Sequence, residues 1–303
     1  MKKFAVFCYG EIGIDNIIQA DQLPSPEVAV FPKAESLHVG GAAANTAIWL
    51  AHFGLSVGLS GNAVGTDAYG QLLVSKLQEH TLLDLENVNI QEELITPYTR
   101  AIVTPDGERS FLIFYYPVTP KVPFALKMLN GADYLALDLY GGPERIDAAR
   151  IAHEAGVTTA IGDVIWLEHD VLPYTGIATN SGSYIRSEFP GIDVRAHSRK
   201  LQRICKGIVI TTDGAGPVHV IDRDGSEFTV QPPRVTVKDA TGAGDAFRSG
   251  LLYGLVRSKS LQESVRIGAA VGSLKVGHFG AAETLPTLDE ALAIAEQLTV
   301  EMH

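Results

Sequence analysis

The strongest constraint on the fold is an alternation between short apolar runs and longer segments with helical spacing, repeated along most of the chain. The apolar runs are rich in residues that favour strands, and they occupy residues 4–8, 57–60, 134–137, 158–161 and 207–210. Segments of helical length and spacing occupy residues 43–53, 69–79, 144–154 and 245–256. Repeated strand and helix units of this kind predict an α/β fold with a mostly parallel central sheet.

Two segments, residues 13–39 and 96–116, depart from this alternation. In the second, the runs 101–104 and 110–114 flank the turn-forming sequence Pro-Asp-Gly-Glu at 105–108, which predicts a β-hairpin. We expect these extra strands to lie outside the main sheet and to cover a site as a lid. No linker or internal repeat interrupts the chain, so one domain is expected over residues 1–303.

The composition and charge of the chain indicate which classes of binding partner to expect. The chain has 303 residues, of which 46% are hydrophobic and 19% charged, so it can bury a large core. A formal net charge of −11 opposes attraction to phosphates of nucleic acids, so we expect no nucleic-acid partner. No uninterrupted apolar run approaches the roughly 20 residues that span a bilayer, so we expect no membrane partner.

Cysteine use and the N-terminus both favour a cytoplasmic protein. Cys8 and Cys205 form neither a C-x-x-C pair nor a ligand cluster, which is typical of buried free thiols in a reducing compartment. Lys2 and Lys3 precede an apolar stretch, as in a secretory signal, but no cleavage pattern follows that stretch. The stretch is better explained as a first strand.

The strongest chemical signal is a loop of small residues at 238–244, which leads directly into a helical pattern. Because Gly242 and Gly244 lack side chains, the backbone N–H groups around Ala243 can approach the oxygens of a phosphate. Asp245 follows at the positive end of the helix, where its carboxylate can accept the proton of a hydroxyl that attacks a γ-phosphate. A helix capped by an aspartate for stability alone would give the same local pattern.

A second glycine pair, Gly40 and Gly41, precedes another helical segment, so the backbone there can also approach a ligand closely. Asn45 lies in the first turns of that otherwise apolar helix and offers a donor and acceptors suited to a polyol hydroxyl. The alternative is that Asn45 only bonds the local backbone.

Together these two blocks resemble the PfkB carbohydrate kinases, the ribokinase-like family that includes ribokinase, fructokinases and adenosine-type nucleoside kinases. The block 40–45 is similar to the first signature of that family, and residues 239–245 are similar to the second, D-x-x-G-A-G-D. Further similar segments follow the order of the family at residues 10–15, 23–24, 61–67, 107–109 and 267–280.

The resemblance implies a three-layer α/β/α, Rossmann-like domain with a mostly parallel central sheet and a small β-strand lid over the sugar. It implies an ATP-dependent phosphotransferase that moves the γ-phosphate to a primary hydroxyl of a sugar or nucleoside. ATP would lie along the C-terminal half. Mg²⁺ would be a cofactor, and many family members also use a monovalent cation such as K⁺ near the loop of the second signature.

The resemblance also implies site residues. The substrate hydroxyls would contact Asp15, Gly40, Gly41 and Asn45. Asp245 would be the base, and Gly242, Ala243 and Gly244 would form the anion hole. The nucleotide would contact Asn180, Thr212, Gly214, Thr241, Gly242 and Gly244. The ligands of a metal ion stay undefined.

The sequence departs from the family pattern in the middle of the chain. The family usually has an N-x-x-E element there, whose Glu helps to organise metal and phosphates, but Asn180 is followed at that spacing by Ser183. Glu188 is the nearest acid, so magnesium handling could be altered or activity lowered. Asp163 also stands in a Gly-Asp-Val sequence where D-P-N is common.

Arginines and aromatic residues near these blocks have open interpretations. Arg248 lies three residues after Asp245 and would hold that carboxylate, reach a phosphate, or be paired structurally. Arg100 and Arg109 would bind a phosphorylated sugar, or would simply be the solvated charges that the polar tip of the hairpin needs. The aromatic residues of the expected lid would stack on a nucleobase or pack within the lid; they are Tyr98, Phe111, Phe114, Tyr115 and Tyr116.

Two other functions compete with a kinase. A catalytically weak sugar and nucleotide sensor of the same fold would explain Ser183 in place of the acid. A dinucleotide-dependent oxidoreductase would explain the repeated strand and helix units, but residues 10–13 do not form G-x-G-x-x-G. A Walker-type P-loop is also absent from the sequence. The sequence does not name the substrate, and it leaves open a homodimer formed through the lid.

Overall fold

The computed structural model describes residues 3–105 and 109–303, which build a main sheet of ten strands. From one edge to the other the strands are β16 (Val300–Met302), β15 (Glu227–Val230), β14 (Gly216–Ile221), β13 (Ile208–Asp213), β12 (Ile177–Ser181), β11 (Thr158–Gly162), β10 (Tyr134–Leu137), β1 (Val6–Gly10), β4 (Val57–Gly61) and β6 (Leu83–Asp84). Pairing is parallel from β13 to β6 and antiparallel from β13 to β16. The predicted α/β fold with a mostly parallel sheet is confirmed.

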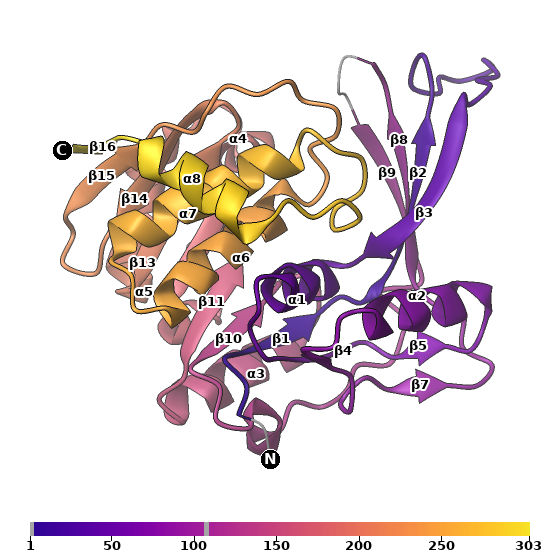
Figure 1. Ribbon diagram of the computed structural model, residues 1–303, viewed down its shortest axis with the longest axis horizontal. Coiled ribbons are helices and arrows are strands. Elements are labelled where there is room, and N and C mark those ends of the chain that lie inside the picture. The colour runs from indigo at the N-terminus through magenta and orange to yellow at the C-terminus, as the bar shows by residue number, and fades with distance from the viewer. Residues whose placement is uncertain (1–2, 106–108) are drawn as a thin grey trace.

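Helices cover both faces of this sheet (Figure 1). They are α1 (Ala42–His52), α2 (Ala68–Gln78), α3 (Pro143–Glu154), α4 (Gly182–Glu188), α5 (Val194–Cys205), α6 (Ala243–Val256), α7 (Leu261–Lys275) and α8 (Leu288–Gln297), with short 3₁₀ turns at Leu126–Leu129 and Leu172–Tyr174. Along β1, Val6 and Cys8 pack into one core with α1, α6, α7 and α8, whereas Phe7 and Tyr9 pack into a second core with α3 and α5. A strand with period two and both faces buried is typical of a three-layer α/β/α architecture.

A second sheet projects from the main body beside α1 and α2 (Figure 1). Its order is β3 (Ala34–Gly40), β2 (Gly13–Gln19), β8 (Tyr98–Val103) and β9 (Arg109–Phe114), and we call it the small sheet. The predicted hairpin is present, since β8 and β9 pair antiparallel. Most of its turn, residues 106–108, lies outside the described residues. A short parallel pair, β5 (Val64–Gly65) with β7 (Ile90–Gln91), lies nearby.

Helices α6 and α7 approach closely because small residues face each other between them. A Cβ added to Gly250 would lie 2.9 Å from the Cα of Gly268, and one added to Gly254 would lie 2.6 Å from the hydroxyl of Ser264. Gly250 and Gly254 therefore allow the close packing of the two helices. This packing fixes the start of α6, where the strongest chemical signal of the sequence lies.

Two smaller expectations can also be compared with the structure. Cys8 and Cys205 are buried free thiols, as predicted. Over residues 3–105 and 109–303, none of the helices has both the length and the apolar character that a bilayer crossing requires.

Candidate active site

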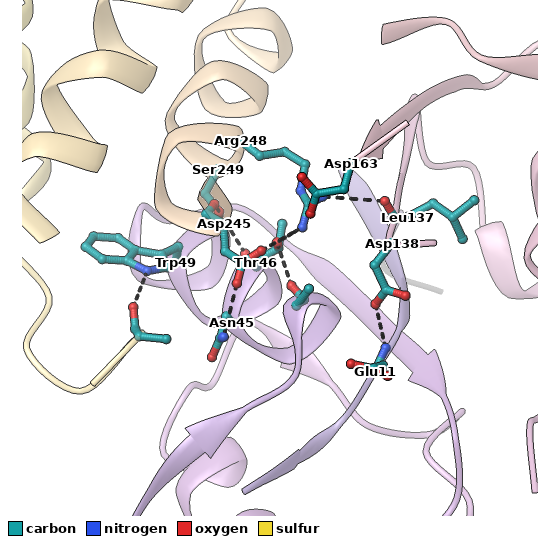
Figure 2. Close-up of polar contacts among 12 residues, drawn as sticks. Glu11, Asn45, Thr46, Trp49, Leu137, Asp138, Asp163, Asp245, Arg248 and Ser249 are labelled. Atoms are coloured by element: carbon teal, nitrogen blue, oxygen red, sulfur yellow. Dashed lines mark hydrogen bonds and ion pairs between the residues drawn. The ribbon is translucent and has the colours of Figure 1, made fainter. Parts of the chain in front are cut away.

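Asp245 lies in the first turn of α6 and is held by one hydrogen bond to each carboxylate oxygen (Figure 2). Its Oδ1 accepts a bond from Nη2 of Arg248 at 2.9 Å, and its Oδ2 accepts one from Nδ2 of Asn45 at 3.1 Å. Asn45 comes from α1, two hundred residues earlier in the chain. The side chain of Asp245 keeps 16% of its surface exposed, so its carboxylate is fixed and still accessible to a ligand.

Arg248 is anchored on three sides, which decides between its possible roles. Besides Asp245, its guanidinium donates to Oγ1 of Thr46 at 3.0 Å and to the carbonyl of Leu137 at 3.5 Å. A Cβ at Gly162 would lie 2.0 Å from Nη1, so β11 has a glycine where the guanidinium passes. With 4% exposure, Arg248 is placed to hold the Asp245 carboxylate rather than to reach out to a phosphate.

The electrostatic surroundings keep Asp245 near the range where a proton can be exchanged at neutral pH. Burial raises the pKa of Asp245 to about 6, while the charge of Arg248 and the hydrogen bond from Asn45 oppose that rise. The carboxyl is therefore mostly ionised at pH 7. It can accept a proton there, and it is more basic than an exposed aspartate.

The loop before Asp245 presents backbone N–H groups to open space. Gly242 has a φ of 72° as the N-cap of α6, and a Cβ there would lie 2.4 Å from Cβ of Ala281. Gly244 is exposed, and an added Cβ would meet nothing within 4 Å. Among the described residues, the amides of Gly242 and Gly244 have no hydrogen-bond acceptor, whereas the amide of Ala243 donates to Ala240. Such free amides at a helix start are suited to an anion.

On the side of the small sheet, Asp15 lies against the first glycine pair. Asp15 is on β2 and Gly40 ends β3, where an added Cβ would lie 2.4 Å from Oδ1 of Asp15. Gly41 has a φ of 90°, and a Cβ there would lie 2.3 Å from the carbonyl oxygen of Glu11. Burial, together with the negative charges of Asp245 and Asp239, raises the pKa of Asp15 to about 7.

Three further acids gather at this edge, and they were not among the predicted site residues. Glu11, Asp138 and Asp163 each follow directly after a strand, namely β1, β10 and β11 (Figure 2). The amide of Glu11 donates to Asp138 at 2.6 Å, and Asp163 accepts a bond from the hydroxyl of Tyr140 at 2.5 Å. Burial and the charge of Asp138 raise the pKa of Glu11 to about 8. Because the carboxyl ends of parallel strands form one edge, an acid shortly after three of the predicted strands was the available signal.

The residues expected to contact a nucleotide form a second group, at the ends of β12 and β13. Oγ1 of Thr212 donates to the carbonyl of Asn180 at 3.2 Å, and Gly214 follows with a φ of 57°. The amide group of Asn180 is buried and has no partner among the described residues, so its donor and acceptor are free for a ligand. The hydroxyl of Thr241, in the loop before α6, likewise has no partner within the described chain.

The departures from the N-x-x-E pattern have a clear structural context. Ser183 is exposed, and its hydroxyl shares a 2.7 Å hydrogen bond with that of Ser181. Glu188 is exposed at the opposite end of α4 from Asn180, so it is poorly placed to stand in for the missing acid.

Most aromatic residues of the small sheet pack against each other. Tyr98 stacks on Phe114 with ring centroids 4.6 Å apart, and Arg100 lies over both rings at 5.7 and 5.8 Å. Arg109 lies over the ring of Phe111 at 5.6 Å, and Phe111 keeps 47% exposure. These arginines are engaged by the sheet itself.

The comparisons with known proteins agree with this geometry. The family description "pfkB family carbohydrate kinase" matches residues 3–139 and 191–288, which is more than half of the chain. A 5-dehydro-2-deoxygluconokinase of Shouchella clausii is 24% identical over 98% of this chain and 97% of its own length. A nucleoside kinase of Methanothermobacter thermautotrophicus is 27% identical over 93% of each chain.

Among solved structures, the ribokinase of Arabidopsis thaliana complexed with ribose and ATP superposes with a TM-score of 0.82 at 20% identity. The alignment covers 97% of this chain and 99% of the other, so the ribokinase-like fold extends over nearly the whole molecule. The chain therefore belongs to the pfkB family of carbohydrate kinases, and its activity is that of a kinase.

Proposed function

We propose that this protein transfers the γ-phosphoryl group of ATP to a primary hydroxyl of a neutral sugar or nucleoside, with Asp245 as the base. The observation that carries the proposal is the position of the Asp245 carboxylate, fixed by Arg248 and Asn45 one residue after the free amide of Gly244. The proton acceptor then acts on the attacking hydroxyl, and the anion-binding loop acts on the phosphoryl group that is attacked.

The transfer follows from these positions. As the hydroxyl oxygen bonds to the γ-phosphorus, its proton passes to Asp245, the bond from phosphorus to the bridging oxygen breaks, and ADP leaves. The N–H groups of Gly242, Ala243 and Gly244 meet the charge on the transferred oxygens, with the Ala243 amide first leaving Ala240. Because the transition state is loose, positioning matters more than the strength of the base.

The nucleotide would lie along β12, β13 and the loop before α6. Asn180, Thr212, Gly214 and Thr241 are supported as its contacts by the unpartnered amide of Asn180 and hydroxyl of Thr241. Magnesium, when bound, would neutralise charge on the phosphates. The buried amide oxygen of Asn180 fits a hydrated cation. The described residues contain no group of three or more His, Cys, Asp or Glu able to hold a metal, so phosphates and water would supply most ligands.

The substrate side favours a neutral polyol. Asp15, Gly40, Gly41 and Asn45 would contact its hydroxyls, since Asp15 lies over Gly40 and the side-chain oxygen of Asn45 has no partner among the described residues. Glu11, Asp138 and Asp163 add hydrogen-bonding groups at the same edge. A sugar acid carries a carboxylate of its own, so repulsion by the ionised carboxylate of Asp245 disfavours it there.

The small sheet would act as a lid that closes over this substrate, because β2 and β3 carry Asp15 and Gly40 while the sheet itself stands beside the main body (Figure 1). We further propose that its exposed apolar strand β9 pairs two copies of the chain. A cytoplasmic location is supported by the two free thiols.

The test is a coupled assay of ADP release over pentoses, hexoses, nucleosides and sugar acids. We expect substrate-dependent release with at least one neutral sugar or nucleoside, and much weaker release with its acid counterpart. Release with sugar acids alone would overturn the proposed substrate class. No substrate-dependent release with any compound would favour the sensor, in line with Ser183 in place of the acid.

A further inference from the structure

Lys275 is a buried cation for which the proposed chemistry has no use. It is the last residue of α7, and its side chain is 1% exposed. Its Nζ donates to the carbonyl oxygen of Asp239 at 2.7 Å and to that of His278 at 3.3 Å, and it lies 3.6 Å from Oδ2 of Asp239. Lysine is almost never fully buried without a partner, and here the partners are oxygens of two loops.

The first of these loops carries the anion-binding amides, and the second packs against it. The carboxylate of Asp239 accepts bonds from the amide of Thr241 at 2.8 Å and from that of Gly280 at 3.0 Å. Gly242 rests on Ala281, the residue after Gly280. The position of the loop before α6 therefore depends on the turn after α7, and Lys275 joins the two.

The charge balance at this point requires a cation. The carboxylate of Asp239 has no exposed surface, and the two carbonyl oxygens direct further negative charge toward the same place. The C-terminal end of α7 adds the negative end of a helix dipole. Backbone carbonyl oxygens arranged in this way can also replace the hydration shell of a potassium ion.

We infer that the Lys275 ammonium serves as a built-in cation, which holds the anion-binding loop in position in place of a bound monovalent ion. The resemblance to PfkB kinases raised the expectation of K⁺ near this loop, but carbonyl oxygens at the base of the loop are already bonded to Nζ. They do not fit an additional K⁺. Lys275 is buried away from substrate, so it is a positioning residue. Its effect on turnover rests on the proposed function, whereas its effect on the loop does not.

The first measurement uses the wild-type protein. Its thermal midpoint and its turnover are compared in KCl, NaCl and tetramethylammonium chloride at equal ionic strength. We expect no difference between the salts in either quantity. A saturable rise of the midpoint or of turnover with K⁺ alone would overturn the inference, whatever any variant does.

The second measurement uses Lys275→Ala, which opens a space lined by the same oxygens and leaves Asp239 without its cation. We expect the thermal midpoint to fall by roughly 5 °C or more and turnover to fall by about 10², since the backbone N–H groups of the loop are no longer held in position. Both should recover substantially and saturably with K⁺ or NH₄⁺ and not with tetramethylammonium. If the thermal midpoint and turnover fall and neither K⁺ nor NH₄⁺ restores them, the inference is overturned and Lys275 has a packing role alone.

Two controls separate the explanations. Lys275→Met fills the space with an apolar chain, so its losses should not respond to K⁺. Lys76→Ala removes a partly exposed ion pair between Lys76 on α2 and Glu283, and should show little change and no response to K⁺. If Lys275→Ala does not fold in any salt, the wild-type comparison decides. Because the thermal midpoint needs no substrate, an absence of ADP release would count only against the proposed function.

Discussion

The Asp245 carboxyl combines two properties that oppose each other in most aspartates: it is largely buried, and it remains mostly ionised at neutral pH. Arg248 and Asn45 reconcile them, because each donates to a different oxygen and together they lower a pKa that burial alone would raise further. Each oxygen keeps a second lone pair for a substrate hydroxyl.

Replacing Asp245 by Asn should lower turnover by about 10² or more, as expected for the loss of a positioned base. The affinity for ATP should stay within a few-fold, because the amide N–H groups that would bind phosphates are backbone groups. Single-turnover kinetics and nucleotide titration separate these two quantities. A variant with near-normal turnover would show that another group accepts the proton.

The pH dependence of turnover follows from the raised pKa of Asp245. Turnover should rise with pH through about 6 and level off above it, because only the ionised form of Asp245 accepts the proton. The folded-state pKa lies above the ordinary value of 3.8, so the folded chain holds this proton more tightly than the unfolded chain does. The contribution of this carboxyl to stability therefore decreases as pH rises from 3.8 to about 6.

Arg248→Met should move the acidic limb of the pH–rate profile to higher pH and lower the plateau, since a charge that lowers the pKa of Asp245 is gone. Arg257→Met is the matched control, because Arg257 is exposed at the other end of α6. An unshifted profile in the first variant would mean that Arg248 does not act on the base.

At the scale of elements, the loop before α6 contains two glycines with different physical roles. Gly242→Ala should lower the thermal midpoint by several degrees, because its φ of 72° is strained for alanine and the new methyl would meet Ala281 at 2.4 Å. Gly244→Ala should fold normally, because its methyl would point into open space, and should instead weaken ATP binding or turnover. Thermal scans paired with kinetics on both variants test this contrast; equal effects on stability would contradict it.

The elements with a strong periodic pattern were predictable to within a few residues. The run at 134–137 coincides with β10, and the segment at 245–256 lies within α6 (Ala243–Val256). Strands β12 and β14 to β16 and helices α4, α5, α7 and α8 were not predicted individually. Strands β14 to β16 pair antiparallel at one edge of the sheet, where no βα repeat reveals a short run.

The meeting of Asn45 and Asp245 in the candidate site was predictable, because a motif concentrates glycines beside each of these polar residues. The site was not predictable where tertiary structure alone makes the contact. The sequence left three interpretations of Arg248 open. Only its hydrogen bonds to the carbonyl of Leu137 and the hydroxyl of Thr46, which the tertiary structure makes, decide between them. Glu188 looked near to Asn180 along the chain, but the course of α4 separates them.

For the whole molecule, the proposed pairing of two chains can be tested through β9, the edge strand of the small sheet. Phe111, Leu112 and Ile113 are 47%, 53% and 64% exposed there, and an exposed apolar edge strand favours association. We expect a dimer by light scattering and a monomer after Ile113→Lys. A wild-type protein that stays monomeric at all concentrations would remove the small sheet as an interface.

The hydrogen bond between Asn45 and Asp245 has a consequence for the time at which activity can begin. It joins the first helix of the chain to one of the last, so a growing polypeptide on the ribosome has its hydroxyl-binding half long before the half that would activate ATP. Under the proposed function, partial translation products would not consume ATP. Synthesis would have to pass α6 before any nucleotide is used.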